Sequence, residues 1–529
     1  MPFTVLKKSR LLSYGRFIGQ LPGYLRRPVT PDEARAAIRG RLKRRNENFL
    51  ELVKESVFDH PASPYAPLLR TAGCEYGDLV KGVEEYGLEG MLQRLQEAGV
   101  RVSLDEFKGR KPIQRGNGIF RAEPHDFDNP YLAGSFGVST GGTSGGSART
   151  RFDLDFLAAR SCYDRVMLDM LDLDQVPMAL WYPALPASTG IANTLRYAKA
   201  GYVPDRWFNM LVDSDLRVGL ESRLATNTII RLGRWIGCPL PRPEPVPLDR
   251  IDRVVDHVIA WLKERGRCAF QSYVSQAVRV AGACRERCPD LSGLVAIVGS
   301  EPLTVIKRRE IEKTGAKVYH RYAATEVGTI AMGCANPSES DDVHLMSDMV
   351  AAVQAKDTGP EEAGPLFFSS LHKVMPKIMI NVQLGDSARV HEWACGCEFE
   401  KLGFHTHLSM VRSHERFTSQ GMAVPSSSLE RAVDEVLTAK YGGTSLDYQW
   451  VELEDKQGRT GLKLRISPDL GSLDEAKVVH DVLEELRKGD EGERMMSDIW
   501  QQSGVLSVVR EFPKATQRGK RVPMLKESS

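Results

Sequence analysis

The sequence predicts an α/β fold, in which helices cover a sheet built largely of parallel strands. Along the middle of the chain, short apolar runs typical of buried strands alternate with segments of helical periodicity. Such alternation is typical of strand–helix–strand units, whose crossover connections make the strands parallel. The chain has 529 residues, which is more than one hydrophobic core usually organises, so two or three domains are expected.

The first 45 residues carry a strong positive charge, with twelve Lys or Arg residues against only Asp32 and Glu33. Thr30-Pro31-Asp32-Glu33 has the form of a capping box with proline at the first helical position, so a helix should begin there. We interpret residues 1–60 as a basic extension that packs on, or leads into, the following domain. The charge indicates either an anionic partner or, more often, a solvated basic face.

The alternating elements can be placed in order along the chain. A short apolar run indicates a strand, and apolar positions three to four residues apart indicate a helix. In parallel sheets, ligands bind at the carboxyl ends of the strands, so the residues that follow each strand are candidates for a site. The expected helices are 160–173, 251–264 and 305–313, and the expected strands are 178–182, 294–298, 317–320 and 378–384.

Composition excludes several classes of protein. The 71 basic and 69 acidic residues nearly balance, so nothing requires a nucleic-acid partner. No apolar run is long enough for a membrane span, and the amino terminus lacks the apolar core of a secretory signal. Nine cysteines in a chain of this length do not indicate a disulfide framework. We therefore expect a cytoplasmic protein without a membrane span and without a nucleic-acid partner.

Residues 139–150, Ser-Thr-Gly-Gly-Thr-Ser-Gly-Gly-Ser-Ala-Arg-Thr, form the most distinctive segment. Its four glycines let the backbone bend tightly and approach a ligand, and its six hydroxyl groups add hydrogen-bond donors. This chemistry suits anionic phosphate oxygens. A flexible Gly/Ser linker is the alternative interpretation. A GxxxxGK[ST] loop is excluded, because no lysine follows the glycine pairs.

Three further motifs follow this loop in order: Gly299-Ser-Glu-Pro-Leu303, Arg321-Tyr-Ala-Ala-Thr-Glu326 and Gly385-Asp386. Together the four resemble the adenylate-forming superfamily, whose pattern is a TSGTTG-like loop, a GGxPL turn, a YGxTE segment and a GD. The tail, Pro513-Lys-Ala-Thr-Gln-Arg-Gly-Lys520, resembles the last superfamily motif, PxTxxGK. The resemblance implies a large N-terminal adenylation domain with parallel and mixed sheets (61–410) and a small mobile α+β C-terminal domain (411–529).

Within that superfamily, the chain most resembles phenylacetate–CoA ligase-like enzymes. Ser63-Pro-Tyr65 is similar to their N-terminal segment, and residues 412–417 and 421–430 parallel their hinge and the strand and helix that follow it. Two positions depart from the pattern. Ala323 stands where the YGxTE segment usually has glycine, next to the adenine pocket, and His414-Glu415 replaces the acidic pair of the hinge.

The resemblance implies ATP-dependent activation of a carboxylic acid as an acyl-adenylate, followed by transfer to CoA as a thioester. A carrier-protein thiol, an amine or a protein cysteine are alternative acceptors. An acyl-protein synthetase and a non-catalytic member of the fold also remain as alternatives. The implied cofactors are ATP, Mg²⁺ and CoA. The implied partners are a small carboxylic acid and CoA or an acyl-carrier protein, and the sequence leaves open a homodimer.

The same resemblance assigns roles to individual residues. Glu326 would bind Mg²⁺, Thr325 would contact the α-phosphate, and Lys520 would neutralise charge on the carboxylate and α-phosphate. Trp181, Tyr182, Phe270 and Tyr273 fall near the expected acid pocket and would suit an aromatic or fatty acid, although aromatic residues more often pack in a core. The nucleotide-binding residues would be Thr140, Gly141, Gly142, Thr143 and Ser144 at the β- and γ-phosphates, Gly299, Ser300 and Glu301 at the strand end, Tyr322 at adenine, Asp386 at the ribose and Arg412 at ribose or phosphate.

Cys395-Gly-Cys397 places two thiols close enough to hold one metal ion, but a structural site usually needs four nitrogen or sulfur donors. Some phenylacetate–CoA ligase-like enzymes carry zinc on a similar Cys…His…CxC set. The resemblance therefore implies a structural zinc site formed by Cys334, His344, Cys395 and Cys397, with His391 as an alternative ligand. Four unrelated residues are the other interpretation.

Overall fold

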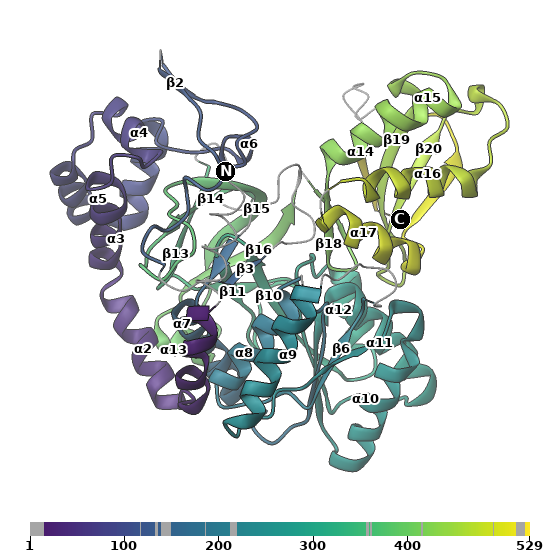
Figure 1. The fold of residues 1–529 in the computed structure, drawn as a ribbon, viewed down its shortest axis with the longest axis horizontal. Helices are drawn as coiled ribbons and strands as arrows, with labels where there is room; N and C mark the ends of the chain where they lie inside the picture. The colour runs from purple at the N-terminus through teal and green to yellow at the C-terminus, as the bar shows by residue number, and fades with distance from the viewer. Residues whose placement is uncertain are drawn as a thin grey trace.

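The protein has two parts built on separate sheets (Figure 1). The computed structural model describes residues 15–528, except 117, 133–135, 139–149, 186, 212–219, 356–358, 360–361, 414–415, 490 and 515–523. The larger part contains a twelve-stranded mixed sheet in the order β13-β14-β15-β16-β12-β11-β10-β9-β8-β5-β6-β7. Its strands are β5 (Met178–Trp181), β6 (Arg206–Asn209), β7 (Pro243–Pro245), β8 (Cys268–Tyr273), β9 (Leu294–Gly299), β10 (Lys317–Ala324), β11 (Gly328–Met332), β12 (Val343–Leu345), β13 (Val350–Gln354), β14 (Gly364–Ser370), β15 (Val382–Glu392) and β16 (Thr406–Ser413).

Half of this sheet is parallel, as the sequence predicts. Strands β7, β6, β5, β8, β9 and β10 all run in the same direction, and helices connect them. Every residue of β8 and of β9 is buried, because helices cover parallel strands on both faces. The helices of this part are α7 (Leu154–Met170), α8 (Thr189–Lys199), α9 (Leu220–Trp235), α10 (Asp252–Arg265), α11 (Val274–Arg287), α12 (Val305–Glu312) and α13 (Glu398–Leu402).

The expected helices and strands are present, with one shift that matters for the site. The strand expected over 378–384 begins only at Val382 and continues to Glu392, so Gly385 and Asp386 lie inside β15 rather than after a strand. The delay follows from Asn381, whose backbone has a φ of 50° and whose side-chain amide donates to the carbonyls of Leu92 and Val100. The chain turns there before it joins the sheet.

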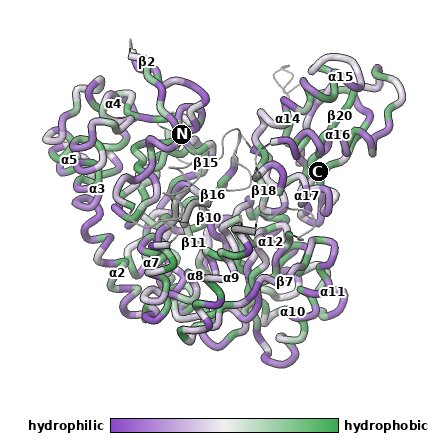
Figure 2. Tube along the Cα trace, in the orientation of Figure 1, coloured by the Kyte–Doolittle hydropathy of each residue, from purple (hydrophilic) through white to green (hydrophobic). Residues whose placement is uncertain are grey.

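Helix α10 illustrates how the helices of this part pack. Its apolar residues Val254, Val255, Val258 and Ile259 are all buried. Figure 2 shows hydrophobic and hydrophilic residues alternating along this helix, as expected for a helix with one face on the sheet. Among the described residues, no helix combines the length and the apolar character that crossing a bilayer would need.

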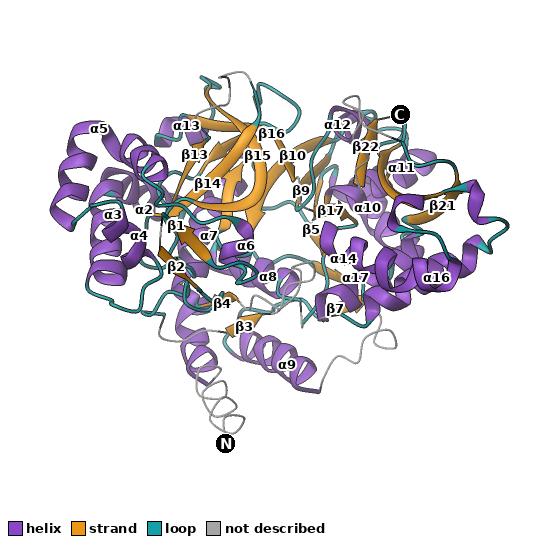
Figure 3. Ribbon diagram, turned by 90° about the horizontal axis from the view of Figure 1, so that it is seen from above, coloured by secondary structure: helices purple, strands orange, loops and turns teal. Residues whose placement is uncertain are grey.

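Helices near the amino terminus lie at one end of the large sheet (Figures 1 and 3). The predicted capping box is present, because the Thr30 hydroxyl accepts from the Glu33 amide at 3.3 Å and the Glu33 carboxylate accepts from the Thr30 amide at 3.0 Å. These elements are α2 (Pro31–Lys43), α3 (Arg45–Val53), a π-helical turn (Lys54–Phe58), α4 (Tyr65–Thr71), α5 (Tyr76–Glu97) and α6 (Leu104–Phe107), followed by the short strands β1 (Ile113–Arg115), β2 (Gly118–Phe120), β3 (Phe136–Val138) and β4 (Thr150–Phe152).

Part of the basic charge of α2 is neutralised within the chain. Arg35 pairs with Asp169 of α7 and, at 2.7 Å, with Glu398 of α13. Arg41 lies 2.7 Å from the fully buried carboxylate of Asp348. These contacts fasten α2 to the large domain, so at least these two guanidinium groups serve packing rather than an external anionic partner.

The smaller part consists of a four-stranded sheet, in the order β21-β20-β19-β22, covered by helices. Its core includes Trp450 and Trp500, both almost completely buried. The β17–β18 hairpin connects it to β16, the last strand of the large sheet. These elements are β17 (Arg416–Ser419), β18 (Met422–Pro425), α14 (Ser426–Ala432), a π-helical turn (Val433–Leu437), α15 (Thr438–Tyr441), β19 (Tyr448–Glu454), β20 (Thr460–Ile466), α16 (Glu475–Arg487), α17 (Glu491–Ser503), β21 (Leu506–Arg510) and β22 (Met524–Ser528).

Replacing Arg41 by leucine should destabilise the protein by about 3–5 kcal/mol, because the buried Asp348 would lose its cationic partner. Tyr163 alone, which donates to Asp348 at 2.6 Å, cannot balance that charge. Urea unfolding measures the loss. Arg39→Leu on the exposed face of the same helix is the control and should change stability by no more than about 0.5 kcal/mol. Equal stability of the two variants would contradict the anchoring role of Arg41.

Candidate active site

A cavity of about 210 Å³ lies at the carboxyl ends of β9 and β10, where it is also bordered by the β17–β18 hairpin. It is lined by the turn after β9, by residues 320–326 at the end of β10, by Asp386 of β15 and by Arg416 of β17. Three of the motifs identified in the sequence therefore meet at one place. For the motifs after β9 and β10 the parallel strands explain why, because their carboxyl ends share one edge of the sheet, whereas Asp386 comes from within the antiparallel strand β15.

Tyr322 and Asp386 form the centre of one wall of this cavity. The Tyr322 hydroxyl donates to the Asp386 carboxylate at 2.7 Å, and Arg416 lies 3.5 Å from its other oxygen. Burial raises the pKa of Tyr322 well above its ordinary value, and the adjacent Asp386 carboxylate adds to this effect. Tyr322 thus remains a neutral hydrogen-bond donor, and Asp386 is held in a fixed orientation by a hydroxyl and a guanidinium.

Glu326 is buried at the same cavity and forms an ion pair that the sequence did not predict. Its carboxylate lies 2.5 Å from the ammonium of Lys108, which caps α6 and is itself buried. Burial disfavours the charged carboxylate, but the Lys108 charge and its hydrogen bond outweigh burial and lower the pKa of Glu326 to about 2. Glu326 is therefore ionised at neutral pH and could offer oxygen ligands to a divalent cation.

Glu301 joins the two parts of the protein. Its carboxylate accepts from the amide of Ser275 at 3.3 Å and from the amide of Gly421, in the β17–β18 turn, at 2.5 Å. Gly421 has a φ of 73°, and a Cβ there would lie 1.9 Å from the Tyr273 ring. Only glycine allows this approach, so the turn of the hairpin can reach Glu301 and seal this side of the cavity.

The turn after β9 is shaped by a close approach of the backbone. A Cβ on Gly299 would lie 2.7 Å from the carbonyl oxygen of Arg321, its partner on β10. The next residue, Ser300, has a φ of 66°, and it lines the cavity. The expected position of 299–301 at a strand end next to the site is confirmed, although the Glu301 side chain contacts protein groups.

Arg412 lies elsewhere than we expected. It donates to Asp341 at 2.7 Å and does not line the cavity, whereas Arg416 does. The reason is the alternation of side chains along β16: Ser413 is the residue opposite Asp386, so its neighbour Arg412 is directed to the other face. The sequence contains both arginines, and only the register of the strand distinguishes them.

Several other expected site residues can be placed, and some cannot. Thr325 and Ala323 line the cavity. Thr140, Gly141, Gly142, Thr143 and Ser144 of the glycine-rich loop, Lys520 of the tail and His414-Glu415 of the expected hinge lie outside the described residues.

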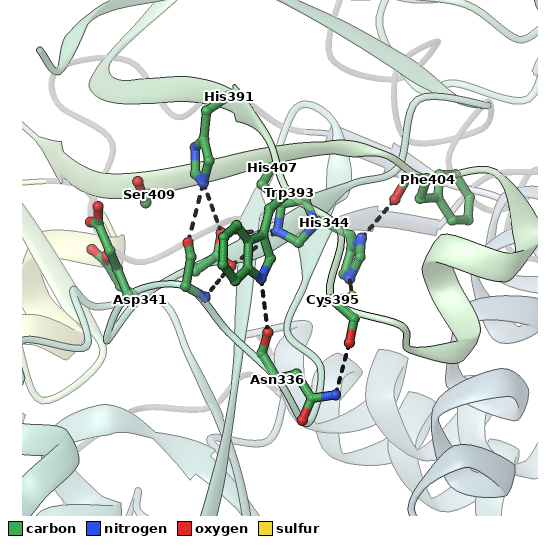
Figure 4. A network of polar contacts seen from close by, with 12 residues as sticks. Asn336, Asp341, His344, His391, Trp393, Cys395, Phe404, His407 and Ser409 are labelled. Atoms are coloured by element: carbon green, nitrogen blue, oxygen red, sulfur yellow. Dashed lines mark hydrogen bonds and ion pairs between the residues drawn. The ribbon is translucent and has the colours of Figure 1, made fainter. Parts of the chain in front are cut away.

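The four residues of the expected metal site come together, from the segment after β11, from β12 and from the start of α13. Cys334, His344, Cys395 and Cys397 are all buried, and their ligand atoms lie within 4.8 Å of one another. His344 Nε2 is 3.4 Å from the sulfur of Cys395 and 3.2 Å from that of Cys397. In Figure 4, its other nitrogen, Nδ1, faces the carbonyl oxygen of Phe404 at 2.8 Å. That contact suits an Nδ1–H donor and leaves the Nε2 lone pair directed at the thiols.

Two thiols of this cluster affect each other's pKa through a hydrogen bond. Cys334 donates to the Cys397 sulfur, which lowers the pKa of Cys397 to about 3 and raises the pKa of Cys334. His391 is not part of the cluster, so this alternative ligand is wrong. Its Nε2 lies 3.2 Å from the Ser338 hydroxyl, on the other side of His407 (Figure 4). Three thiols and one imidazole in this geometry fit a tetrahedral zinc ion, whose sulfur ligands lie about 3.8 Å apart at bond lengths of about 2.3 Å.

No family model and no curated protein matches this chain. Solved structures do match. A 2-hydroxyisobutyryl-CoA ligase, in complex with 2-HIB-AMP and CoA in the thioesterification state, has 18% identity and a TM-score of 0.56, with 95% of this chain and 91% of that chain covered. A malonyl-CoA ligase with methylmalonyl-CoA and AMP has 12% identity and a TM-score of 0.42, with 72% of this chain and 71% of that chain covered.

The chain therefore shares the fold of this 2-hydroxyisobutyryl-CoA ligase, and the α/β fold expected from the sequence is confirmed. The o-succinylbenzoate CoA synthetase of Bacillus subtilis also matches, at 11% identity and a TM-score of 0.42, with 73% of this chain and 68% of that chain covered.

Replacing Lys108 by methionine should destabilise the protein by about 3 kcal/mol at neutral pH, because Glu326 would stay buried without its cation. The folded-state pKa of Glu326, about 2, lies below its unfolded value of 4.5. The ion pair thus stabilises the fold fully above pH 4.5, and its contribution is lost as the pH falls toward 2.

Urea titrations of wild type and Lys108→Met between pH 7 and pH 3 test this. The stability difference should narrow below about pH 4.5. Lys111→Met is the matched control, because Lys111 is 70% exposed and its pair with Asp105 should contribute less than about 1 kcal/mol. A pH-independent difference for Lys108→Met would exclude the Glu326 pair as its source.

Proposed function

We propose that this protein is an AMP-forming acid–CoA ligase of the phenylacetate–CoA ligase-like kind, which activates a carboxylic acid with ATP and transfers the acyl group to CoA. The observation that carries the proposal is the cavity in which Tyr322, Glu326 and Asp386 meet. These residues come from two motifs of the superfamily. The fold shared with 2-hydroxyisobutyryl-CoA ligase, which binds an acyl-adenylate and CoA, supports the same conclusion.

Asp386 and Tyr322 are suited to hold the nucleoside. A fixed carboxylate can accept hydrogen bonds from both hydroxyls of a ribose, and its hydrogen bond from Tyr322 fixes it here. The Tyr322 ring would lie against adenine. Arg416, rather than Arg412, is the guanidinium at this end of the cavity, and we assign to it the contact with ribose or phosphate that the motif comparison gave to Arg412.

In the first half-reaction, a carboxylate oxygen of the acid attacks the α-phosphorus of ATP and pyrophosphate leaves. This step needs alignment of the reactants and neutralisation of charge rather than covalent help from the protein. Glu326 is ionised and buried at the cavity, which fits a role in binding Mg²⁺. The cation would either replace the Lys108 ammonium as the partner of this carboxylate or lie next to it. We assign the phosphate contacts to residues 140–144 and to Thr325, and the α-phosphate charge to Lys520.

In the second half-reaction, the thiol of CoA attacks the acyl-adenylate, the thioester forms and AMP leaves. We propose that residues 61–410 form the fixed domain and 411–529 the mobile one, with the hinge within 412–417. The contact between Glu301 and Gly421 crosses this boundary and is held by one hydrogen bond to a backbone amide, so it could break and re-form as the domain rotates. The CoA ligases among the matching structures favour CoA over a carrier protein or an amine.

We also propose that Cys334, His344, Cys395 and Cys397 bind a structural zinc ion. The metal would tie the segment after β11 and strand β12 to the loop that precedes α13. All nine cysteines of the chain are free thiols in the structure, which supports a reducing, cytoplasmic setting in which thiolates can serve as ligands.

The purified protein should contain about one zinc ion per chain, measured by mass spectrometry of the metal content. Cys395→Ser should lose the metal and melt at a lower temperature. Cys284→Ser is the control, because Cys284 is equally buried but lies outside the cluster, so this variant should keep the zinc. Metal-free wild-type protein, prepared without chelators, would refute the zinc proposal.

Asp386→Ala should abolish measurable ATP binding, whereas Lys520→Ala should retain it and lose acid-dependent pyrophosphate exchange. The reason is that Asp386 contacts ATP in both the ground state and the transition state, whereas Lys520 is needed as charge develops. Calorimetry measures binding, and exchange of labelled pyrophosphate with a panel of acids measures adenylation. Arg416→Ala and Arg412→Ala form a matched pair, of which only Arg416→Ala should weaken ATP binding. Normal exchange by Lys520→Ala would remove the tail from the mechanism, and no exchange by wild type with any acid would favour a non-catalytic protein.

A further inference from the structure

Arg321 is a buried cation at the cavity that the proposed mechanism does not use. It is 7% exposed and lines the cavity. Its Nη2 donates to the Tyr197 hydroxyl at 3.0 Å and lies 2.9 Å from the Asp164 carboxylate. Its Nε and Nη1 are buried and, within the described part of the chain, have no hydrogen-bond partner. Buried donors of a charged group that lack an acceptor are costly, so a ligand that supplied one would bind favourably.

The surroundings of Arg321 carry more positive than negative charge. Asp164 faces three guanidinium groups, those of Arg160, Arg196 and Arg321. Arg196 donates hydrogen bonds of 2.8 and 2.9 Å to both oxygens of the Asp164 carboxylate. Arg160 instead donates to the Thr329 hydroxyl at 3.2 Å, and burial, together with the charge of Arg196, lowers its pKa well below the ordinary value. One carboxylate shared by three cations leaves a surplus that a bound anion would relieve.

The side chains behind Arg321 are polar and buried, although they do not themselves line the cavity. The Tyr197 hydroxyl donates to Gln271, whose amide in turn donates to Asn193 at 3.1 Å and to the Tyr182 hydroxyl at 3.4 Å. Trp181 and Phe270, which we expected near an aromatic or fatty acid, do not line the cavity. Both are almost completely buried, and the Trp181 indole donates to a backbone carbonyl. Of the expected aromatic residues, Tyr273 lines the cavity, and the Tyr182 ring packs edge-on against the Tyr273 ring.

The position of Arg321 on its strand separates it from the nucleoside. Adjacent residues of β10 direct their side chains to opposite faces, so Arg321 and its neighbour Tyr322 serve different parts of the site. Tyr322 contacts Asp386, where we place the ribose and adenine. Arg321 instead contacts Asp164 of α7 and Tyr197 of α8. A group bound by Arg321 therefore belongs to the acid rather than to the nucleoside.

We infer that Arg321 binds a second carboxylate of the substrate, so that the acid activated at this site is a dicarboxylic acid. This inference rests on the proposed adenylation function. One carboxylate of the substrate would react at the α-phosphorus of ATP, and the other would accept hydrogen bonds from the Arg321 guanidinium, with the Tyr197–Gln271 network keeping the arginine in place.

Acid-dependent pyrophosphate exchange with matched acids tests the inference. Glutarate is compared with pentanoate, adipate with hexanoate, and 4-carboxyphenylacetate with phenylacetate. Wild type should prefer the dicarboxylate in at least one pair by about 100-fold or more in kcat/KM, because the monocarboxylate leaves the buried arginine donors unpaired. Arg321→Met should lose that preference, and Arg321→Lys, which keeps the charge but not the planar geometry, should retain part of it.

Each other outcome contradicts a different statement. Equal or faster exchange with every monocarboxylate would overturn the role of Arg321 and leave the adenylation function intact. No exchange with any acid, including the monocarboxylates, would refute the adenylation function itself. A weaker affinity for ATP in Arg321→Met, measured by calorimetry without acid, would show that the arginine serves a nucleotide phosphate instead. If Arg321→Met does not fold, the preference of the wild type between the paired acids still decides the question.

Discussion

The position of β10 is the constraint on which the rest of the structure depends. This strand is parallel to β9 on one side and antiparallel to β11 on the other, so the pairing in the sheet changes from parallel to antiparallel at β10. Its carboxyl end delivers Arg321, Tyr322 and Glu326 to the cavity, because it shares an edge with the ends of β8 and β9. The antiparallel strands that follow then lead the chain to Cys334 and His344. The candidate active site and the candidate metal site are thus two consequences of one change in strand direction.

Buried charge surrounds the cavity, and the geometry of the pairs gives each a different meaning. Lys108 and Glu326 form a closed pair, in which one cation faces one carboxylate. Asp164 instead shares its charge among several arginines, and two donors of Arg321 have no partner among the residues that the structure describes. A closed pair mainly preserves a conformation, whereas an unbalanced cluster favours an anionic ligand. The contrast separates the pair that holds Glu326 from the cluster on which the proposed preference for a dicarboxylate rests.

Polar contacts, several of them hydrogen bonds, join the two parts of the protein. Gly421 lies close to the Tyr273 ring, and its amide donates to the Glu301 carboxylate. The hydroxyl of Thr304, which caps the amino terminus of α12, donates to Glu454 of β19 at 2.6 Å. Hydrogen bonds between small or backbone groups can be exchanged at low cost when a domain moves, whereas interdigitated apolar side chains cannot. The nature of this contact agrees with a C-terminal domain that changes its position between two half-reactions.

The sequence by itself determined what depends on local pattern. The capping box at Thr30 and the alternation of helices and strands were apparent from residue types and spacing. The ordered motifs and the Cys334–Cys397 ligand set were apparent from their resemblance to known families. Only the tertiary structure decided the partners that lie far apart in the chain. Lys108 reaches Glu326 from more than two hundred residues away, Arg416 rather than Arg412 faces Asp386, and Arg321 is surrounded by α7 and α8. Periodicity specifies which face of an element is buried, but register and packing determine what that face meets. For this reason the fold and the motifs of a candidate site could be predicted from the sequence, while the electrostatic surroundings of that site could not.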